Sequence, residues 1–326
     1  MQIISWIIGT LLQWYIWMPI VAVLMFLTWR NYRKIEDFTP VESVLLVLEI
    51  PRTNDKQELA AEQLFASLHG ILRDNKELRL SGGHQEHISF EIASVNGQIR
   101  FYVWVPKTLQ SFVEGQIYSQ YPTVQIHQAD EDYTEHERDH EVAYSTELTL
   151  TTDEFLPIRT FQNFEVDPLA GITGTLAKLE TTGEELWIQV LVRPIPDDWQ
   201  NAADRYINSI KNGRMFSLPG FGGSMQWLIG VLGALWQPPE QGANQSTVVE
   251  LSDRDKTRIS EAEKKATKLG YEVKIRLVYM GESQTNAKLR MQALVGTFKQ
   301  FNSTNLNGFH AVKSAFGKEF IDKYRK

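Results

Sequence analysis

The residues HERDH at positions 136–140 have the types and spacing of a zinc site. Two histidines four residues apart lie on one side of a helix and can bind one zinc ion, and the glutamate beside the first can act as a general base. His136, Glu137 and His140 therefore define one hypothesis, a membrane-bound zinc protease. However, the two positions between Glu137 and His140 are both charged, and the sequence indicates no third protein ligand, which a mononuclear zinc site requires. We interpret the segment as a polar surface linker, with His136 and His140 as the alternative metal ligands.

The stretch GITGTLAK at 171–178 has the composition of a phosphate-binding loop. Such a loop places lysine directly after its last glycine and opens a helix with it. Here Asp167-Pro168 already has the pattern of a helix start, so we expect Gly171 and Gly174 inside that helix, where they would allow close helix packing. No G-K-[ST] occurs in the chain, so nucleotide hydrolysis is not expected.

Composition narrows the chemistry further. The chain contains no cysteine, which excludes disulfides and thiolate ligands. A net charge of −7 argues against a nucleic-acid-binding surface, and we predict no direct nucleic-acid contact. No nucleophile and base are paired by spacing. We therefore predict a non-enzymatic protein with no catalytic residues, no cofactor and no metal.

The first 29 residues carry no charged side chain. A helix over most of this stretch would be roughly 40 Å long, enough for one tilted crossing of a hydrocarbon core about 30 Å thick. Basic residues follow at once, which predicts an outside amino terminus and cytoplasmic soluble domains. We predict a membrane anchor over residues 1–34. Its interfacial aromatic, kink and basic residues are Trp6, Trp14, Trp17, Pro19, Trp29, Arg30, Arg33 and Lys34.

Residues 41–130 alternate between strand and helix patterns. SVLLVLEIP is a near-continuous apolar run typical of a buried strand. HISFEIAS and GQIRFYVWV alternate apolar and polar residues on either side of Asn96-Gly97, the strongest short hairpin signal. Helical apolar spacing follows the first strand and the hairpin, and PTVQIHQ ends the series. The order strand, helix, strand, strand, helix, strand predicts a ferredoxin-like unit with both helices on one face of an antiparallel sheet.

A similar order returns in residues 144–326, after an acidic linker over 131–143. The segment ends with a weak strand near 308–313. This second unit carries a long helical insertion over 197–270. The predicted fold class is therefore α+β: a transmembrane helix followed by two tandem ferredoxin-like units.

The insertion contains an apolar stretch with no charge from 215 to 239. Its expected helical part, 224–236, is too short to cross a bilayer. It could lie in the membrane interface, contact a partner, or be buried in the core, and the sequence does not decide among these. The candidate contact residues are Trp227, Leu228, Ile229, Leu232 and Trp236.

Two segments carry a family resemblance: VLEIPRTNDKQELAAEQLFASLHGIL and DPLAGITGTLAKLETTGEELWIQVLVRPIPDDW. Together with QALVGTFKQFNSTNLNGF and the apolar amino terminus, they resemble a family of unknown function from bacterial candidate phyla. That family is similar to the membrane-anchored amino-terminal region of conjugation-type, type IV secretion ATPases. Its members often continue into a motor domain of the FtsK–HerA kind, whereas this sequence ends at KYRK without one.

The resemblance implies a single-pass protein of the bacterial cytoplasmic membrane that works with an ATPase motor in cis or in trans. We also expect homo-oligomers, since sheet edges and helix faces offer subunit contacts. The sequence thus favours a non-catalytic assembly module of a secretion or DNA-translocation machine. The alternatives are the zinc protease and a membrane scaffold unrelated to secretion.

Overall fold

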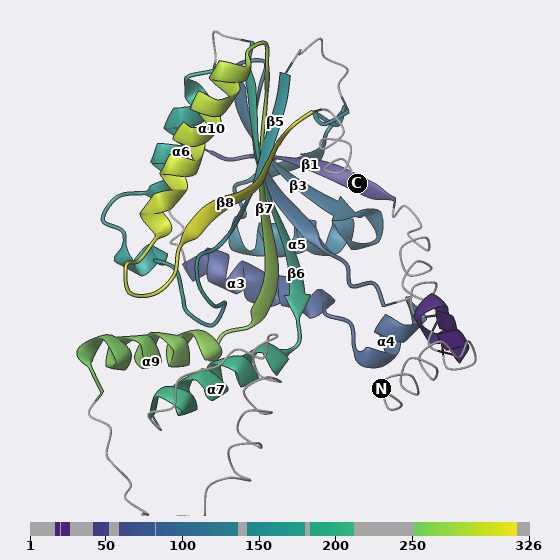
Figure 1. Ribbon diagram of the computed structural model, residues 1–326. Coiled ribbons are helices and arrows are strands. Elements are labelled where there is room, and N and C mark those ends of the chain that lie inside the picture. Colours follow the sequence, from purple (N-terminus) through teal and green to yellow (C-terminus); the bar gives the residue numbers. More distant parts are fainter. Residues whose placement is uncertain are drawn as a thin grey trace, which may run out of the picture. The chain divides into compact units, whose positions relative to one another are not determined.

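The structure is a computed structural model (Figure 1). It describes residues 17–19, 21–26, 42–51, 59–81, 83–135, 142–179, 183–211 and 251–317. Two parts are described separately. The smaller part comprises residues 1–42 and 75–84 and contains the short helix α4 (Asn75–Leu80). The larger part, Ser43–Asp74 with Gln85–Lys326, contains the sheet.

The larger part is built on one eight-stranded sheet in which every neighbouring pair is antiparallel. The strand order is β4-β1-β3-β2-β6-β7-β5-β8. The strands are β1 (Ser43–Glu49), β2 (Ile88–Val95), β3 (Gln98–Pro106), β4 (Gln125–Gln128), β5 (Val142–Leu150), β6 (Glu185–Ile195), β7 (Gly270–Gly281) and β8 (Phe309–Phe316). The prediction of an α+β fold with an antiparallel sheet is confirmed.

The predicted hairpin joins β2 to β3. Asn96 and Gly97 both have positive φ, 51° and 73°, which is the backbone of a type I′ turn. This turn matches the twist of the flanking strands and makes Val95 and Gln98 the first pair of the ladder. The register of the hairpin is therefore fixed by two residues that the sequence identifies.

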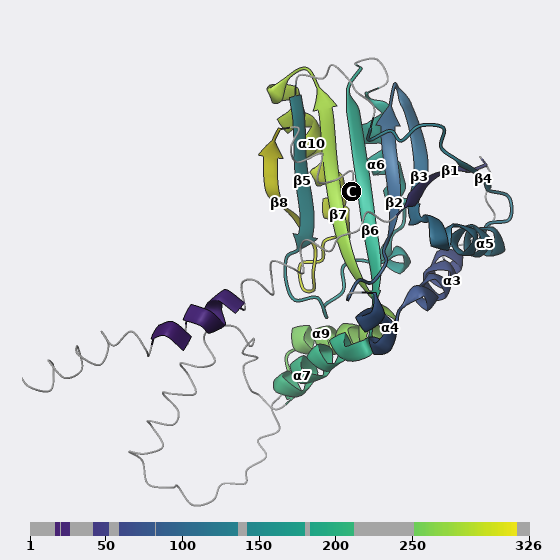
Figure 2. The same cartoon turned by 90° about the vertical axis from the view of Figure 1, so that its right-hand side faces the viewer.

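One face of the sheet is covered by four helices: α3 (Leu59–Leu68), α5 (Gln110–Gln120), α6 (Pro168–Ala177) and α10 (Gln284–Phe298). The side chains of β2 show that all four lie on the same face. Ile88 and Phe90 pack in the core beneath α3 and α5, while Ile92, two residues on, packs against the core beneath α6 and α10. Figure 2 shows the strands in front of α6 and α10.

The opposite face has no covering helix among the described elements. Its core includes Leu45, Tyr102, Trp187 and Val278, and the chain that follows β4 places Tyr133 over it. Tyr133 and Thr134 are both buried. These residues belong to the predicted acidic surface linker, so the expectation of a wholly solvated linker is wrong at this point.

Two further helices, α7 (Gln200–Lys211) and α9 (Asp253–Ala266), follow β6 and precede β7. They pack on each other and on Phe155 and Leu156 in a separate small core. Ala203 and Tyr206 of α7 and Ile259 of α9 are buried there.

Candidate functional site

The sheet opens at the end where β5 leaves β7. The ladder between them runs from Val142↔Gly281 to Leu148↔Ile275 and then stops. β7 continues to Gly270 and stays paired with β6, whereas β5 stays paired with β8 to Leu150↔Phe309. The two strands therefore diverge and leave a notch between them.

Asn307 is the side chain that holds β5 away from β7. It is buried, and its Oδ1 accepts from the Thr152 backbone N–H at 3.0 Å. Its Nδ2 donates to the Asp153 carbonyl at 2.8 Å and to the Leu156 carbonyl at 3.0 Å. The chain beyond β5 is thereby tied to the β8 side rather than to β7.

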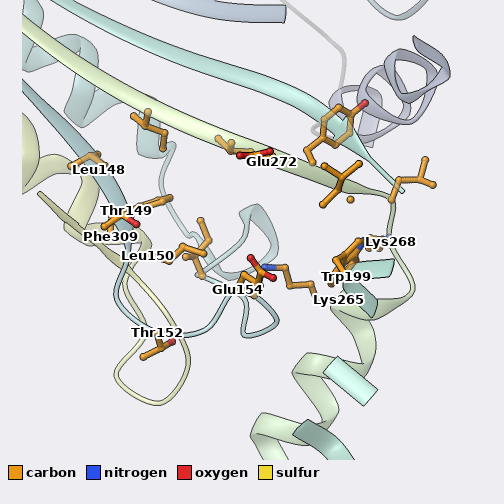
Figure 3. A pocket seen from close by; sticks show the side chains of 17 residues that line it. Leu148, Thr149, Leu150, Thr152, Glu154, Trp199, Lys265, Lys268, Glu272 and Phe309 are labelled. Atoms are coloured by element: carbon orange, nitrogen blue, oxygen red, sulfur yellow. The ribbon is translucent and has the colours of Figure 1, made fainter. Parts of the chain in front are cut away.

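The notch contains a cavity of about 790 Å³, within the size range of ligand sites. Figure 3 shows Leu148, Thr149, Leu150 and Phe309 on one side and Trp199, Lys265 and Lys268 on the other. The remaining lining residues are Thr152, Glu154, Ile158, Ile195, Leu269, Gly270, Tyr271, Glu272, Val273 and Ile275. The lining is mostly apolar and includes the charged residues Glu154, Lys265, Lys268 and Glu272.

Lys265 is a cation of the cavity that forms no ion pair with a carboxylate oxygen within the described part of the chain. Its ammonium group donates to the Glu154 carbonyl oxygen, and Figure 3 shows the two side chains pointing toward each other. Burial lowers the pKa of Lys265, while the charge of Glu154 opposes this shift. Lys268, by comparison, forms an ion pair with Glu62. An ammonium group has three donors, so Lys265 retains capacity for a further acceptor.

Trp199 closes the Gly270 end of the cavity. A Cβ on Gly270 would collide with the Trp199 indole, so only glycine allows this approach. The indole Nε1 is buried and has no hydrogen-bond partner in the part of the chain that the structure describes. The first residue of β7 is thus fixed as glycine by packing rather than by a turn.

A second polar cluster lies on the helix-free face. Glu91 of β2 is buried, and the Tyr133 hydroxyl donates to its Oε2 at 2.5 Å, while Gln189 donates to the same hydroxyl at 3.2 Å. Burial raises the pKa of Glu91 to about 7 and raises the pKa of Tyr133 well above its ordinary range. The adjoining cavity has a volume of only about 20 Å³. This is room for a water molecule rather than a substrate, so the cluster ties the linker to the sheet.

A third polar cluster lies at the other end of β6. The buried Glu184 carboxylate accepts from the Tyr279 hydroxyl at 2.7 Å, from Asn286 at 3.2 Å and from Arg290 Nε at 3.0 Å. Hydrogen bonds and an ion pair compensate this buried charge, and they join α10 to the sheet. The cluster is structural.

The predicted zinc motif lies outside the described residues, as do Trp6, Trp14, Trp29, Arg30, Arg33, Lys34 and the apolar insertion residues Trp227, Leu228, Ile229, Leu232 and Trp236. His136, Glu137 and His140 therefore remain predictions. Within the described ranges, no three His, Asp or Glu side chains converge in a way that would hold a metal ion.

Residues 171–177 of this stretch are helical, as predicted, and Lys178 is the C-cap of the helix. Asp167 caps α6 by accepting from the Leu169 backbone N–H at 2.8 Å, and Gly171 and Gly174 lie inside the helix. The interpretation that these glycines allow close packing is wrong for the described part of the chain, because a Cβ on either glycine would meet no atom of it within 4 Å.

The predicted anchor is described only in part. Residues 17–19 and 21–26 are helical, with Trp17 and Pro19 in the first of these segments. Their apolar side chains are exposed, with Met18 at 63% and Met25 at 71%. Over the ranges for which the structure gives a description, no helix has the length and apolar character needed to cross a membrane.

Sequence reasoning missed three charged groups at buried or partly buried positions: Lys265, Glu91 and Glu184. Lys265 lies in a sequence of alternating basic and acidic residues, which is typical of a solvated helix face. Glu91 occupies the outward position of an alternating strand, and the single signal of its burial was an aromatic residue, Tyr133, within an acidic linker.

The fold and the notch define a class: an α+β module on a single antiparallel sheet, helical on one face, with an open strand edge. The chain belongs to the family described as domain of unknown function DUF8128, whose model matches residues 37–321. No curated protein matches the sequence. The family description names neither an ATPase nor a secretion system, so that part of the resemblance stays a prediction.

Proposed function

We propose that the chain is a non-catalytic assembly module that an amino-terminal helix attaches to the cytoplasmic membrane. The observation that carries this proposal is that residues 17–19 and 21–26 are helical and apolar and that their large side chains are exposed. Leaving such side chains in water costs roughly 1.5–3 kcal/mol each, and a lipid environment removes this cost. In the sequence, Arg30, Arg33 and Lys34 follow, as expected at a cytoplasmic membrane surface.

We further propose that each half of the sheet is a ferredoxin-like unit. Its support is the recurrence of one chain order: β1, α3, β2, β3, α5, β4 in the first half and β5, α6, β6, β7, α10, β8 in the second. The strands are also arranged alike, β4-β1-β3-β2 and, read from the opposite edge, β8-β5-β7-β6. The outer strands β4 and β8 would then offer edges for subunit contact in a homo-oligomer.

The partner that we propose is an ATPase motor of the conjugation type, supplied in cis or in trans. This step rests on the sequence resemblance. The module itself would anchor and position the motor without catalysing a reaction. The lipid bilayer is the other partner.

Membrane attachment is tested by fractionating cells that produce the full chain and a variant lacking residues 1–34. We expect the full chain in the membrane pellet after alkaline carbonate washing and the shortened chain in the supernatant. A full chain that washes off the membrane would refute the anchor.

Assembly is tested after gentle solubilisation, by crosslinking and measuring the mass of the purified particle. We expect an oligomer or a complex that contains an ATPase. A membrane-bound monomer without any partner would refute the assembly role and leave the anchor intact.

A further inference from the structure

The open edge of β7 has a definite backbone polarity that follows from the Asn96-Gly97 turn. A two-residue turn makes Val95 and Gln98 a hydrogen-bonded pair, and in antiparallel ladders hydrogen-bonded and non-hydrogen-bonded pairs alternate. Odd-numbered residues of β2 therefore direct their N–H and C=O groups to β3, and even-numbered ones direct them to β6.

The alternation can be followed across the sheet. Phe90 faces Val190 in a hydrogen-bonded pair, so the odd residues of β6 bond to β7. Because Arg193 lies opposite Glu272, the even residues of β7 bond to β6 and its odd residues face β5. Two independent hydrogen bonds agree with this assignment, since Thr151 N–H donates to the Gly308 carbonyl and Gly317 N–H to the Ala143 carbonyl, both on the β8 side of β5.

The backbone groups of Tyr271 and Val273 consequently point into the notch. The β5–β7 ladder ends at Ile275, so no described strand pairs with these two residues on that side. Leu150 of β5, an even residue, presents its N–H and C=O to the notch from the opposite side. The donors and acceptors of Tyr271 and Val273 recur two residues apart, about 7 Å, which is the repeat of a β-strand.

The notch also offers side-chain complementarity to a strand. Val273 is 50% exposed and Leu269 is 48% exposed, so apolar surface lies beside the open backbone. At the Gly270 end, the partly buried ammonium of Lys265 has one acceptor among the described residues, the Glu154 carbonyl. An apolar side chain of the bound segment would cover the exposed apolar surface, and a carboxylate would accept from the Lys265 ammonium.

We propose that the notch between β5 and β7 is a strand-addition site for an extended peptide segment of a partner protein, with alternating apolar side chains and an acidic side chain that contacts Lys265. Main-chain hydrogen bonds to Tyr271 and Val273 supply affinity, and the carboxylate sets the register. This inference deepens the proposed function by naming how the module holds a partner. It requires neither the membrane anchor nor an ATPase.

The decisive variant is Val273→Pro, because proline removes the N–H that points into the notch and leaves the β6 ladder intact. Its matched control is Glu272→Pro, which removes an N–H that points to Arg193 of β6. We expect Val273→Pro to unfold at nearly the wild-type temperature and Glu272→Pro to unfold earlier. The reverse order would overturn the assignment of the open edge.

The binding test uses the full chain in detergent micelles and a phage-displayed library of random short peptides. We expect enriched peptides with alternating apolar residues and one acidic residue. Their affinity should fall about tenfold for Val273→Pro and for Lys265→Met. Hydrogen exchange at Tyr271 and Val273 should slow on binding, whereas exchange at Glu272 is slow throughout.

Enrichment of no peptide, or equal binding to wild type and Val273→Pro, would overturn the proposal. So would tight binding of a fatty acid that competes with the peptides and ignores Val273→Pro, because the cavity would then be a lipid site. Membrane fractionation is unaffected by these outcomes, so failure of the notch proposal and failure of the anchor proposal are separable.

Discussion

Replacing Glu91 by glutamine should remove most of the pH dependence that this carboxyl gives to folding. Burial raises the pKa of Glu91 to about 7 from a usual value of 4.5, so the folded chain holds this proton where the unfolded chain releases it. A raised folded-state pKa contributes stability that is present below about pH 4.5 and lost as the pH rises through about 7.

The size of the effect follows from the two pKa values. Between about pH 5 and about pH 8, the wild-type free energy of unfolding should fall by about 2.5 kcal/mol through this group alone. Glu91→Gln keeps the shape and an oxygen that accepts from the Tyr133 hydroxyl, but it cannot ionise. The variant should therefore be the more stable protein at about pH 8 and nearly equal to wild type at about pH 5.

The assay is urea denaturation of both proteins in detergent micelles, followed by tryptophan fluorescence at the two pH values. Every other titratable group is present in both proteins, so the difference between their pH profiles isolates Glu91. Tyr133→Phe serves as a second control, since loss of the hydroxyl donor that lowers the pKa of Glu91 should move the transition to higher pH. Parallel pH profiles for wild type and Glu91→Gln would refute the reasoning.

Three further changes test the packing around the sites. Glu184→Ala leaves Arg290 without its carboxylate partner and should lower the free energy of unfolding by about 3 kcal/mol. Urea denaturation measures this loss, and a loss below about 1 kcal/mol would show that the pair is not buried. Gly270→Ala should lower the free energy of unfolding by about 1–3 kcal/mol, because the new Cβ collides with Trp199. Adding Trp199→Leu should recover part of that loss in thermal melts. If the effects of the two substitutions simply add in the double mutant, the contact is contradicted. Asp167→Ala should cost about 1 kcal/mol by removing the cap of α6, while Asp167→Asn should cost little, and equal losses would argue against a capping role.

The parts of the fold that could be predicted from the sequence are those set by local chemistry. Alternating apolar residues and the Asn96-Gly97 turn determine β2, β3 and their register, because both act within a few residues. The start of α6 at Asp167-Pro168 was predicted for the same reason. These local signals are the same whichever distant strand pairs with β2 or β3 in the sheet.

The joining of the two halves could not be predicted in this way. β2 pairs with β6 over Ile88↔Val192 to Ser94↔Leu186, but alternation in each strand only indicates which face is apolar. It says nothing about the lateral neighbour, so a central strand and an edge strand have the same pattern. The burial of Glu91 could not be predicted, because the residue that covers it, Tyr133, is far along the chain.

The notch also depends on a long-range contact that local sequence patterns do not reveal, and this contact is made by a single residue. Asn307-Gly308 is the dipeptide of a tight hairpin, yet its asparagine is buried and bonds to the backbone of Thr152, Asp153 and Leu156. These hydrogen bonds satisfy backbone groups of the segment that follows β5, which would otherwise need partners on β7. They therefore hold β5 and β7 apart. The backbone of Tyr271 and Val273 is then left open on that side. A long-range amide contact thus determines where the sheet is incomplete, and an incomplete antiparallel sheet is what an extended partner segment can complete.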